Sequence, residues 1–395
     1  MAWNRPVKNS VHAPVRALVL AGGGARGSYQ VGVWRALTEL GWRPGIITGT
    51  SVGSLNGAMF ALDLYETARD MWLTIRSQDV MELPEQNADL SELHAFLRDV
   101  VRQGGMDVSP LEEIVERVLD EDALRASPIR LGLVTVEQRG LKARELALDD
   151  IPHGKVKDYL LASAACFPAL RAHIIDGVSY LDGGYRDNMP TALAQKMGAD
   201  ELVCVDLEGV GITRPNRTGL PTTLIRSYWE LGDILHFDPD TARRNMELGY
   251  YDTRRAMGYL RAYAVSCDAR SCQDAAAFAW QFGQQQKSVR EKYPVTLTAD
   301  LALRLANLKD AELAPLEAAA EDVGVDPTQF YTTETLGKAF LEKCEKDRIE
   351  SFAPLFEGSG RAADAARAAL LPNTFLQALV YRVLTGPVLP EVIEK

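Results

Sequence analysis

The chain has 395 residues, of which 47% are hydrophobic and 25% charged, and its formal net charge at pH 7 is −11. This composition excludes a disordered chain and suffices for one large core, or for a core with a smaller domain. Sequence-independent nucleic-acid binding needs clustered lysine and arginine, so the acidic balance argues against it. The net charge also gives no general attraction to anionic membranes.

An apolar run at residues 17–21 predicts a buried strand, and a glycine-rich segment separates it from a helix that begins near Ser28. The segment consists of Gly22, Gly23, Gly24, Ala25, Arg26 and Gly27. Its backbone N–H groups can converge on one point beside a helix N-terminus, which predicts an anion cradle. In acyl transfer the anion is the tetrahedral oxyanion. Arg26 either adds a cation there or is a surface or carboxylate-paired arginine.

The same glycine-rich segment also fits the G-x-G-x-x-G fingerprint of a dinucleotide site. Such a site needs an acidic residue at the end of a second strand. Here the second predicted strand, residues 45–48, continues instead into Gly49-Thr50-Ser51-Val52-Gly53.

This G-x-S-x-G segment places a serine at a strand-to-helix turn. A Cβ atom at either flanking position would clash in such a turn, and Gly49 and Gly53 avoid that clash. The hydroxyl of Ser51 would stand above the sheet near a helix N-terminus, so Ser51 is the candidate nucleophile. Taken alone, the pattern also suits a glycine-rich helix start with a capping serine.

Residues 63–125 read as amphipathic helices, an insert that we expect to cover part of the sheet and to shape an acyl pocket. A third strand is predicted at residues 129–135. A hairpin follows at residues 174–181, and Asp182-Gly183-Gly184 comes directly after it. Asp182 is the candidate base, because burial would raise its proton affinity. Taken alone, this tripeptide is only a turn.

A fourth strand is predicted at residues 202–207, and strands alternating with helices indicate an α/β fold with a mostly parallel sheet flanked by helices. Glycine and proline then mark a loop. We therefore predict a catalytic core at residues 15–215 and a mainly helical C-terminal region at residues 220–395 that packs on it. Residues 375–384 are apolar on more than one face, which predicts a buried helix, a lid, a dimer surface or a bilayer contact.

Five histidines bear on the choice between a dyad and a triad: His12, His94, His153, His173 and His236. Only His236 follows Asp182, as the order of a Ser-Asp-His triad requires, and its apolar neighbours favour a buried or capping histidine. The five cysteines do not suggest a disulfide framework. Cys267 and Cys272 lack the second ligand pair of a zinc site. We expect no metal and no organic cofactor.

The N-terminal residues 1–10 contain no apolar core of secretory length, and no apolar run reaches the ~20 residues of a membrane span. We expect a cytoplasmic protein, whose membrane contact would be peripheral, transient and dependent on a local apolar face.

In this order, the glycine-rich segment, the serine turn and Asp182-Gly183-Gly184 resemble motifs of the patatin-like phospholipases, and more distantly of the cytosolic phospholipases that share a Ser-Asp dyad. Residues 162–168 resemble the small-residue and proline block that precedes the family's catalytic aspartate. The resemblance covers about residues 15–210. Residues 245–252 are similar to a helix that packs back on the core in many bacterial relatives.

The resemblance implies a three-layer α/β core with an oxyanion loop at Gly22 to Gly27 and a Ser51–Asp182 dyad. It also implies a serine acyl hydrolase that acts on lipid acyl esters, such as a phospholipase A, a lysophospholipase or a lipase-type esterase. A thioesterase or acyltransferase with the same dyad is the alternative, and so is a non-catalytic lipid-binding protein.

Overall fold

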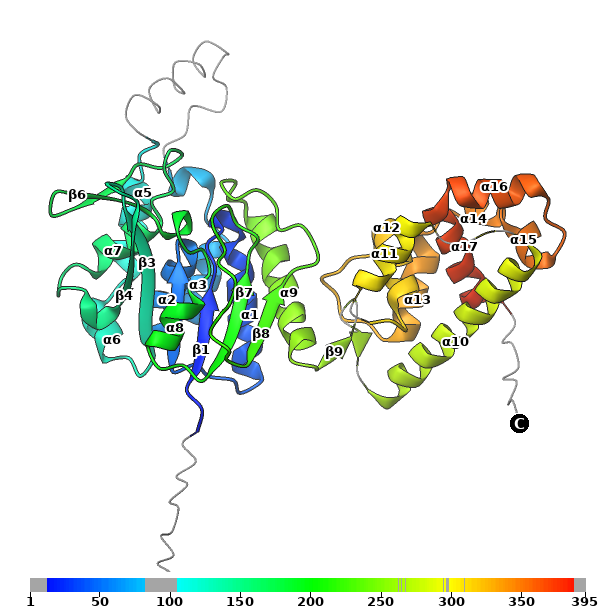
Figure 1. Ribbon diagram of the computed structural model, residues 1–395, viewed down its shortest axis with the longest axis horizontal. Coiled ribbons are helices and arrows are strands. Elements are labelled where there is room, and N and C mark those ends of the chain that lie inside the picture. Colours follow the sequence, from blue (N-terminus) through cyan, green and yellow to red (C-terminus); the bar gives the residue numbers. More distant parts are fainter. Residues whose placement is uncertain are drawn as a thin grey trace, which may run out of the picture. The chain divides into compact units, whose positions relative to one another are not determined.

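The computed structural model describes residues 13–81, 105–261, 263, 265–266, 268–293, 295, 298–308 and 310–386. They form two compact units, which divide between Ala256 and Met257 (Figure 1). The first unit contains the sheet and all the motifs identified above.

The sheet of the first unit is parallel in its centre. Five strands run parallel in the spatial order β3-β2-β1-β7-β8. They are β1 (Arg16–Leu20), β2 (Ile46–Thr50), β3 (Arg130–Glu137), β7 (Glu201–Asp206) and β8 (Thr222–Arg226). The apolar runs of β1, β2, β3 and β7 reflect burial on both faces, which is typical of parallel strands covered by helices. The predicted mostly parallel α/β fold is confirmed, and β1, β2, β3 and β7 correspond to the four predicted strands.

Three further strands are antiparallel to β3 or to its neighbour: β4 (Lys142–Ala147), β5 (His173–Ile175) and β6 (Val178–Asp182). Strand β2 pairs with residues 130–134 of β3, and β6 pairs with residues 135–137. Because β4 pairs with residues 132–137, it occupies the opposite edge of β3. Strands β2 and β6 therefore share one edge of β3, and their C-terminal ends meet there.

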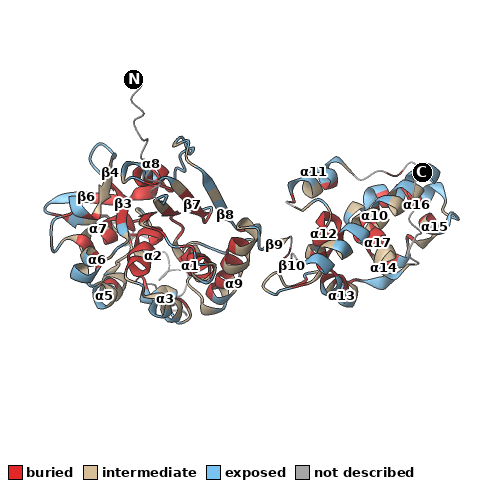
Figure 2. Ribbon diagram, turned by 90° about the horizontal axis from the view of Figure 1, so that it is seen from below, coloured by how far each residue is buried: buried red, intermediate tan, exposed pale blue. Residues whose placement is uncertain are grey.

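Helices flank the sheet on both faces (Figure 2). On one face Ala17 and Val19 pack with Ala194 of α8 (Thr191–Lys196). On the other face Leu20 and Ile47 lie against Gly57 of α2 (Val52–Ala61). The helices of this unit also include α1 (Ser28–Glu39), α3 (Tyr65–Trp72), α5 (Ser109–Val118), α6 (Glu121–Ala126) and α7 (Val156–Ser163). Residues 82–104 of the predicted insert lie outside the described residues.

Short 3-10 turns complete the unit: η1 (Gly24–Gly27), η2 (Ser77–Asp79), η3 (Leu148–Asp150) and η4 (Gly183–Tyr185). The first unit ends with α9 (Pro239–Ala256), which packs along α1. A Cβ on Gly32 of α1 would collide with the carbonyl of Met246, so glycine permits this close approach. The hydroxyl of Tyr29 donates to Asp252 Oδ2 at 2.7 Å.

The boundary between the two units, after Ala256, lies beyond the domain boundary that the sequence predicted at residues 215–220. Strand β8 pairs with β7, and α9 belongs to the first unit. The glycine- and proline-rich residues 208–219 form a loop between two strands of one sheet. In the edge strand β8 only Ile225 is buried, so its sequence carries little strand signal.

The second unit is helical apart from the small pair β9 (Leu260–Arg261) and β10 (Val265–Ser266). Its helices are α10 (Ala269–Lys292), α11 (Ala299–Asn307), α12 (Ala314–Asp322), α13 (Thr333–Lys343), α14 (Lys346–Glu350), α15 (Ala353–Glu357), α16 (Ala362–Leu370) and α17 (Pro372–Thr385). Residues Phe375, Leu376, Leu379 and Val380 of α17 are buried, and α17 contacts α10, α12 and α14. None of the described helices is long and apolar enough to span a bilayer.

Candidate active site

Ser51 lies at the turn between β2 and α2, with backbone angles φ 56° and ψ −131°. A side chain rarely adopts this positive φ, so the turn is strained. A Cβ on Gly49 would collide with the backbone of Gly53, and a Cβ on Gly53 would collide with the carbonyl of Leu20. The two glycines therefore allow α2 to begin directly against the ends of β1 and β2.

Two hydroxyl groups hold this turn in place. The backbone N–H of Ser51 donates to Ser163 Oγ at 3.0 Å, and Ser163 Oγ in turn donates to the carbonyl of Val134 at 2.7 Å. Thr50 Oγ1 donates to the carbonyl of Asp187 at 2.8 Å. Ser163 falls in the small-residue block noted in the sequence, but a serine among alanines gave no signal of this role.

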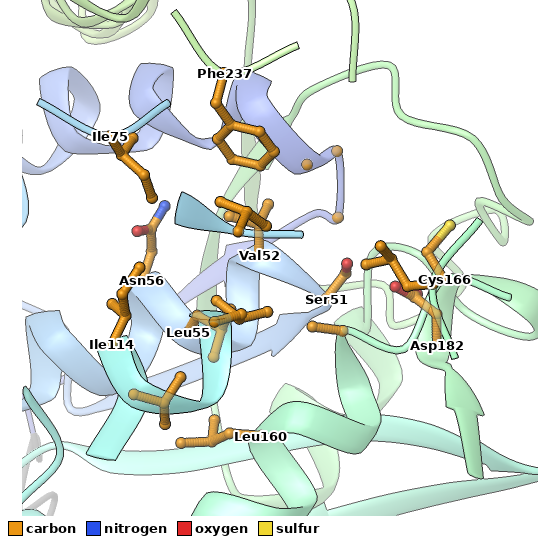
Figure 3. A pocket seen from close by; sticks show the side chains of 18 of the residues that line it. Ser51, Val52, Leu55, Asn56, Ile75, Ile114, Leu160, Cys166, Asp182 and Phe237 are labelled. Carbon is orange, nitrogen blue, oxygen red and sulfur yellow. The ribbon is translucent and has the colours of Figure 1, made fainter. Parts of the chain in front are cut away.

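Asp182 ends β6 next to the end of β2, and its side chain faces the hydroxyl of Ser51 (Figure 3). The amide of Gly184 donates to Asp182 Oδ1 at 2.7 Å, and Ser51 and Asp182 line the same cavity. Only 6% of Asp182 is exposed. Burial raises the pKa of Asp182 to about 6, against the lowering effects of the Ser51 hydroxyl and the Gly184 amide. The group is thus a stronger base than an ordinary aspartate.

Three residues of the glycine-rich segment, Gly22, Gly23 and Gly24, line the same cavity as Asp182. The amide of Gly22 donates to the carbonyl of Asn188 at 3.3 Å, and the amide of Ala25 donates to the carbonyl of Ile234 at 2.8 Å. Within the described residues, no acceptor is assigned to the amides of Gly23 and Gly24. These two N–H groups are therefore available for an anion.

Arg26 binds backbone carbonyl groups. Its Nε donates to Gly232 at 2.8 Å, and one of its terminal nitrogens donates to Glu208 at 2.8 Å and to Leu207 at 3.1 Å. The guanidinium thereby joins the loop after β7 to the loop before α9. Ala25, Arg26 and Gly27 are not among the residues that line the cavity.

The cavity beside Ser51 is strongly apolar. One wall is α2, and the others come from the end of α3, from α5, from α7 and from the loop before α9 (Figure 3). Apolar residues on these walls include Leu55, Met59, Leu62, Met71, Ile75, Leu111, Ile114, Val118, Leu160 and Phe237. Helix α5 belongs to the insert that was expected to shape an acyl pocket.

Buried polar groups fix one wall of the cavity. Asn56 Nδ2 donates to the carbonyl of Gly27 at 3.0 Å and to Gln30 Oε1 at 2.9 Å. Asn56 Oδ1 accepts from Trp72 Nε1 at 3.1 Å. These bonds satisfy an amide that would otherwise destabilise an apolar wall, and they connect η1 with α2 and α3.

No histidine of the described residues lines the cavity. His236 is exposed, although its neighbours Leu235 and Phe237 line the cavity. His173 lies 3.4 Å from Asp158, and His153 lies 2.9 Å from Asp122, both outside the cavity. His12 and His94 lie outside the described residues, as does Cys267.

Over the same described ranges, no group of three or more histidine, cysteine, aspartate or glutamate residues could hold a metal ion. Cys166 lines the cavity beside Asp182, where burial and the neighbouring carboxylate raise the pKa of its thiol to about 11. The thiol therefore stays protonated near neutral pH.

A strained serine turn, a buried carboxylate and an apolar cavity at the carboxyl edge of a parallel sheet define an α/β protein with a hydrolase-like site. Residues 18–194 match the model of the patatin-like phospholipase family. These residues therefore form a patatin-like phospholipase domain.

The relatives include lysophospholipase NTE1 of Phaeosphaeria nodorum, which is 28% identical over 233 residues, or 54% of this chain and 14% of that protein. Patatin-like phospholipase domain-containing protein 7 of Rattus norvegicus is 30% identical over 200 residues, or 48% of this chain and 13% of that protein. The chain thus matches a small part of the length of these curated relatives. Among solved structures, VipD from Legionella pneumophila aligns over 95% of this chain and 93% of its own, with 15% identity and a TM-score of 0.38.

Proposed function

We propose that the protein is a serine acyl hydrolase that cleaves lipid acyl esters through a dyad of Ser51 and Asp182. The observation that carries this proposal is that the Ser51 side chain faces the buried Asp182 carboxylate at one end of an apolar cavity. A hydroxyl oriented by a base of raised pKa is an activated nucleophile.

In the proposed reaction, Ser51 Oγ attacks the ester carbonyl and its proton passes to Asp182. The amides of Gly23 and Gly24 donate to the oxyanion as it forms. When the tetrahedral intermediate collapses, Asp182 returns the proton to the oxygen of the leaving alcohol. Water then attacks the acyl-enzyme while Asp182 takes its proton, and Asp182 returns that proton to Ser51 Oγ as the fatty acid is released.

The cavity suits a long acyl chain. Lining residues recur along α2 from Ser51 through Leu55 and Met59 to Leu62. At the helical rise, Ser51 and Leu62 are ~16 Å apart along the axis, which is the length of about twelve methylene groups. Burying an alkyl chain against such walls stabilises the complex by roughly 0.8 kcal/mol for each methylene group. A chain bound along α2 would place its ester carbon at Ser51.

Labelling with a fluorophosphonate probe, followed by peptide mapping, tests the nucleophile. We expect the wild type to be labelled on Ser51 and Ser51→Ala to remain unlabelled. Ser179→Ala on β6 serves as the control, because Ser179 bonds to Gln138 and does not line the cavity. Undiminished labelling of Ser51→Ala would reject the assignment. Product analysis in the presence of a competing alcohol separates hydrolysis from acyl transfer, since an acyltransferase would release the new ester in place of the fatty acid.

A further inference from the structure

Exposed apolar side chains gather at one end of the first unit. Eight large apolar side chains are exposed among the described residues of this unit. Two of them, Leu224 and Tyr228, lie away from that end. The other six, which we call the rim, are Leu141, Ile174, Val178, Tyr185, Val210 and Ile212. They lie in the β3–β4 turn, the β5–β6 hairpin, η4 and the loop after β7, all at the edge where β2, β3 and β7 end. Surface apolar groups that cluster in this way mark an interaction site.

Hydrogen bonds connect these segments to one another and to the cavity. The amide of Gln138 donates to Ser179 at 2.9 Å, which ties the β3–β4 turn to the hairpin. Arg186 Nε donates to the carbonyl of Leu141 at 2.7 Å. The amide of Ile212 donates to Gly184 at 2.8 Å. Val210 is 77% exposed and also lines the cavity, so the rim borders the cavity mouth.

Two cations flank one apolar residue of the rim. Arg139 and Lys142 stand on either side of Leu141 at the β3–β4 turn. Both cations are exposed, and no ion pair within the described ranges involves them.

The acidic side chains of these segments are paired with other cations. Glu208 lies 3.3 Å from Arg226, and Asp176 lies 2.9 Å from Lys155. This local excess of positive charge contrasts with the net charge of −11 of the whole chain.

We propose that the rim docks the protein on the surface of an anionic phospholipid bilayer, an inference that rests on the proposed function of the cavity as an acyl-chain site. The unpaired cations Arg139 and Lys142 match anionic headgroups, and the apolar side chains of the rim insert at the level of the acyl chains. Because the rim borders the cavity, an acyl chain can pass from the bilayer toward Ser51 without crossing water. A rim for a protein partner would not need to open into the cavity.

Flotation of the full-length Ser51→Ala protein with lipid vesicles tests the rim without requiring turnover. We expect stronger binding to phosphatidylcholine vesicles that contain phosphatidylglycerol than to vesicles of phosphatidylcholine alone. Each cation near an anionic surface contributes about fivefold to partitioning, so the double reversal Arg139→Glu/Lys142→Glu should weaken binding by roughly 25-fold or more. Ile212→Asp should weaken it by about fivefold or more.

The matched controls are Lys287→Glu/Arg290→Glu, which changes the net charge equally on α10, and Leu370→Asp, which alters an apolar side chain that is 79% exposed on α16. Both controls should bind like the parent. Leu141→Asn is a second rim variant, because asparagine tolerates the positive φ of 48° at this position. Circular dichroism verifies the fold of each variant.

The rim is rejected if the parent does not float, if it binds both vesicles equally, or if the controls lose as much binding as the rim variants. Hydrolysis of a water-soluble ester by the wild type is measured separately. Flotation without hydrolysis would retain the rim and reject the proposed function, whereas hydrolysis without flotation would reject the rim alone.

Discussion

Asp182→Asn is expected to make the protein both less active and more stable above pH 6. The activity should fall by about 10²–10⁴-fold, which is the usual contribution of a general base. The stability should rise, because the wild type must bury an ionised carboxylate and the amide of asparagine carries no charge. Asparagine Oδ1 can still accept from Gly184, so the local hydrogen bonding is retained.

The size of the gain follows from the pKa of Asp182, which is about 6 in the folded protein against 3.8 for an ordinary aspartate. A difference of about two pKa units corresponds to about 3 kcal/mol in the free energy of unfolding. The folded pKa is raised, so this group's contribution to stability is fully present below pH 4 and is lost as the pH rises through 6. The advantage of Asp182→Asn should therefore be about 3 kcal/mol at pH 8 and should shrink toward zero near pH 4.

Thermal unfolding of both proteins from pH 4 to pH 8 measures this difference, and the melting temperature of the variant should be higher by about 6–12 °C at pH 8. Asp187→Asn is the matched control. Burial also raises the pKa of Asp187 to about 6, but its carboxylate bonds to the amide of Met189 and does not line the cavity. The Asp187→Asn variant should become more stable and stay active, because Asp182 remains as the base. A stability difference that does not depend on pH would refute the burial argument, and turnover within tenfold of the wild type would refute the role of Asp182 as base.

The other predictions concern the pH profile, the turn, the oxyanion donors and the cavity. Because protonated Asp182 cannot accept a proton, kcat/KM for a soluble ester should fall below a pKa of about 6 and be flat above it; a flat profile through pH 5 would contradict this. Ser163→Ala leaves the Ser51 amide without its acceptor. Fluorophosphonate labelling of Ser51, stopped at set times, should slow by about tenfold, and KM for the soluble ester should be unchanged. Gly23→Ala would press a methyl group against Leu207 and turn the Gly23 amide away from the oxyanion. The value of kcat in steady-state assays should therefore fall by about 10²–10³-fold. Adding Leu207→Ala to the same chain should restore part of the lost activity. Ala58→Phe blocks the cavity ~10 Å along α2 from Ser51. In a series of p-nitrophenyl esters, the ratio of kcat/KM for long acyl chains to kcat/KM for short ones should fall by more than tenfold.

Most of the sheet and the motif positions could be predicted because their signals are local. The strands β1, β2, β3 and β7 are continuous apolar runs, and the turn at Ser51 needs glycine on both sides within five residues. The hairpin of β5 and β6 was also predicted, and Asp176-Gly177 form its turn. Each of these features is fixed by residues adjacent in the sequence, so the pattern contains the information.

The features that the sequence did not reveal depend on partners far along the chain. The carbonyl groups that bind Arg26 lie 181 to 206 residues away, and they became neighbours only through the loops after β7 and before α9. Ser163 acquires its contact with Ser51 across 112 residues. Strand β8 was hidden because it is mostly exposed at the edge of the sheet. In all these cases the contact exists only once the sheet order is known.

The sheet order also explains why the proposed dyad can operate without a histidine. In a triad, a mobile imidazole must be oriented by a third group. Here β3 fixes both partners through its own register, because Thr50 of β2 pairs with Val134 and Asp182 of β6 pairs with the next residue, Thr135. Two strands that run toward each other along one edge thus bring the serine and the carboxylate together through backbone hydrogen bonds. The amide of Gly184 then fixes the carboxylate, which leaves its other oxygen for the serine hydroxyl.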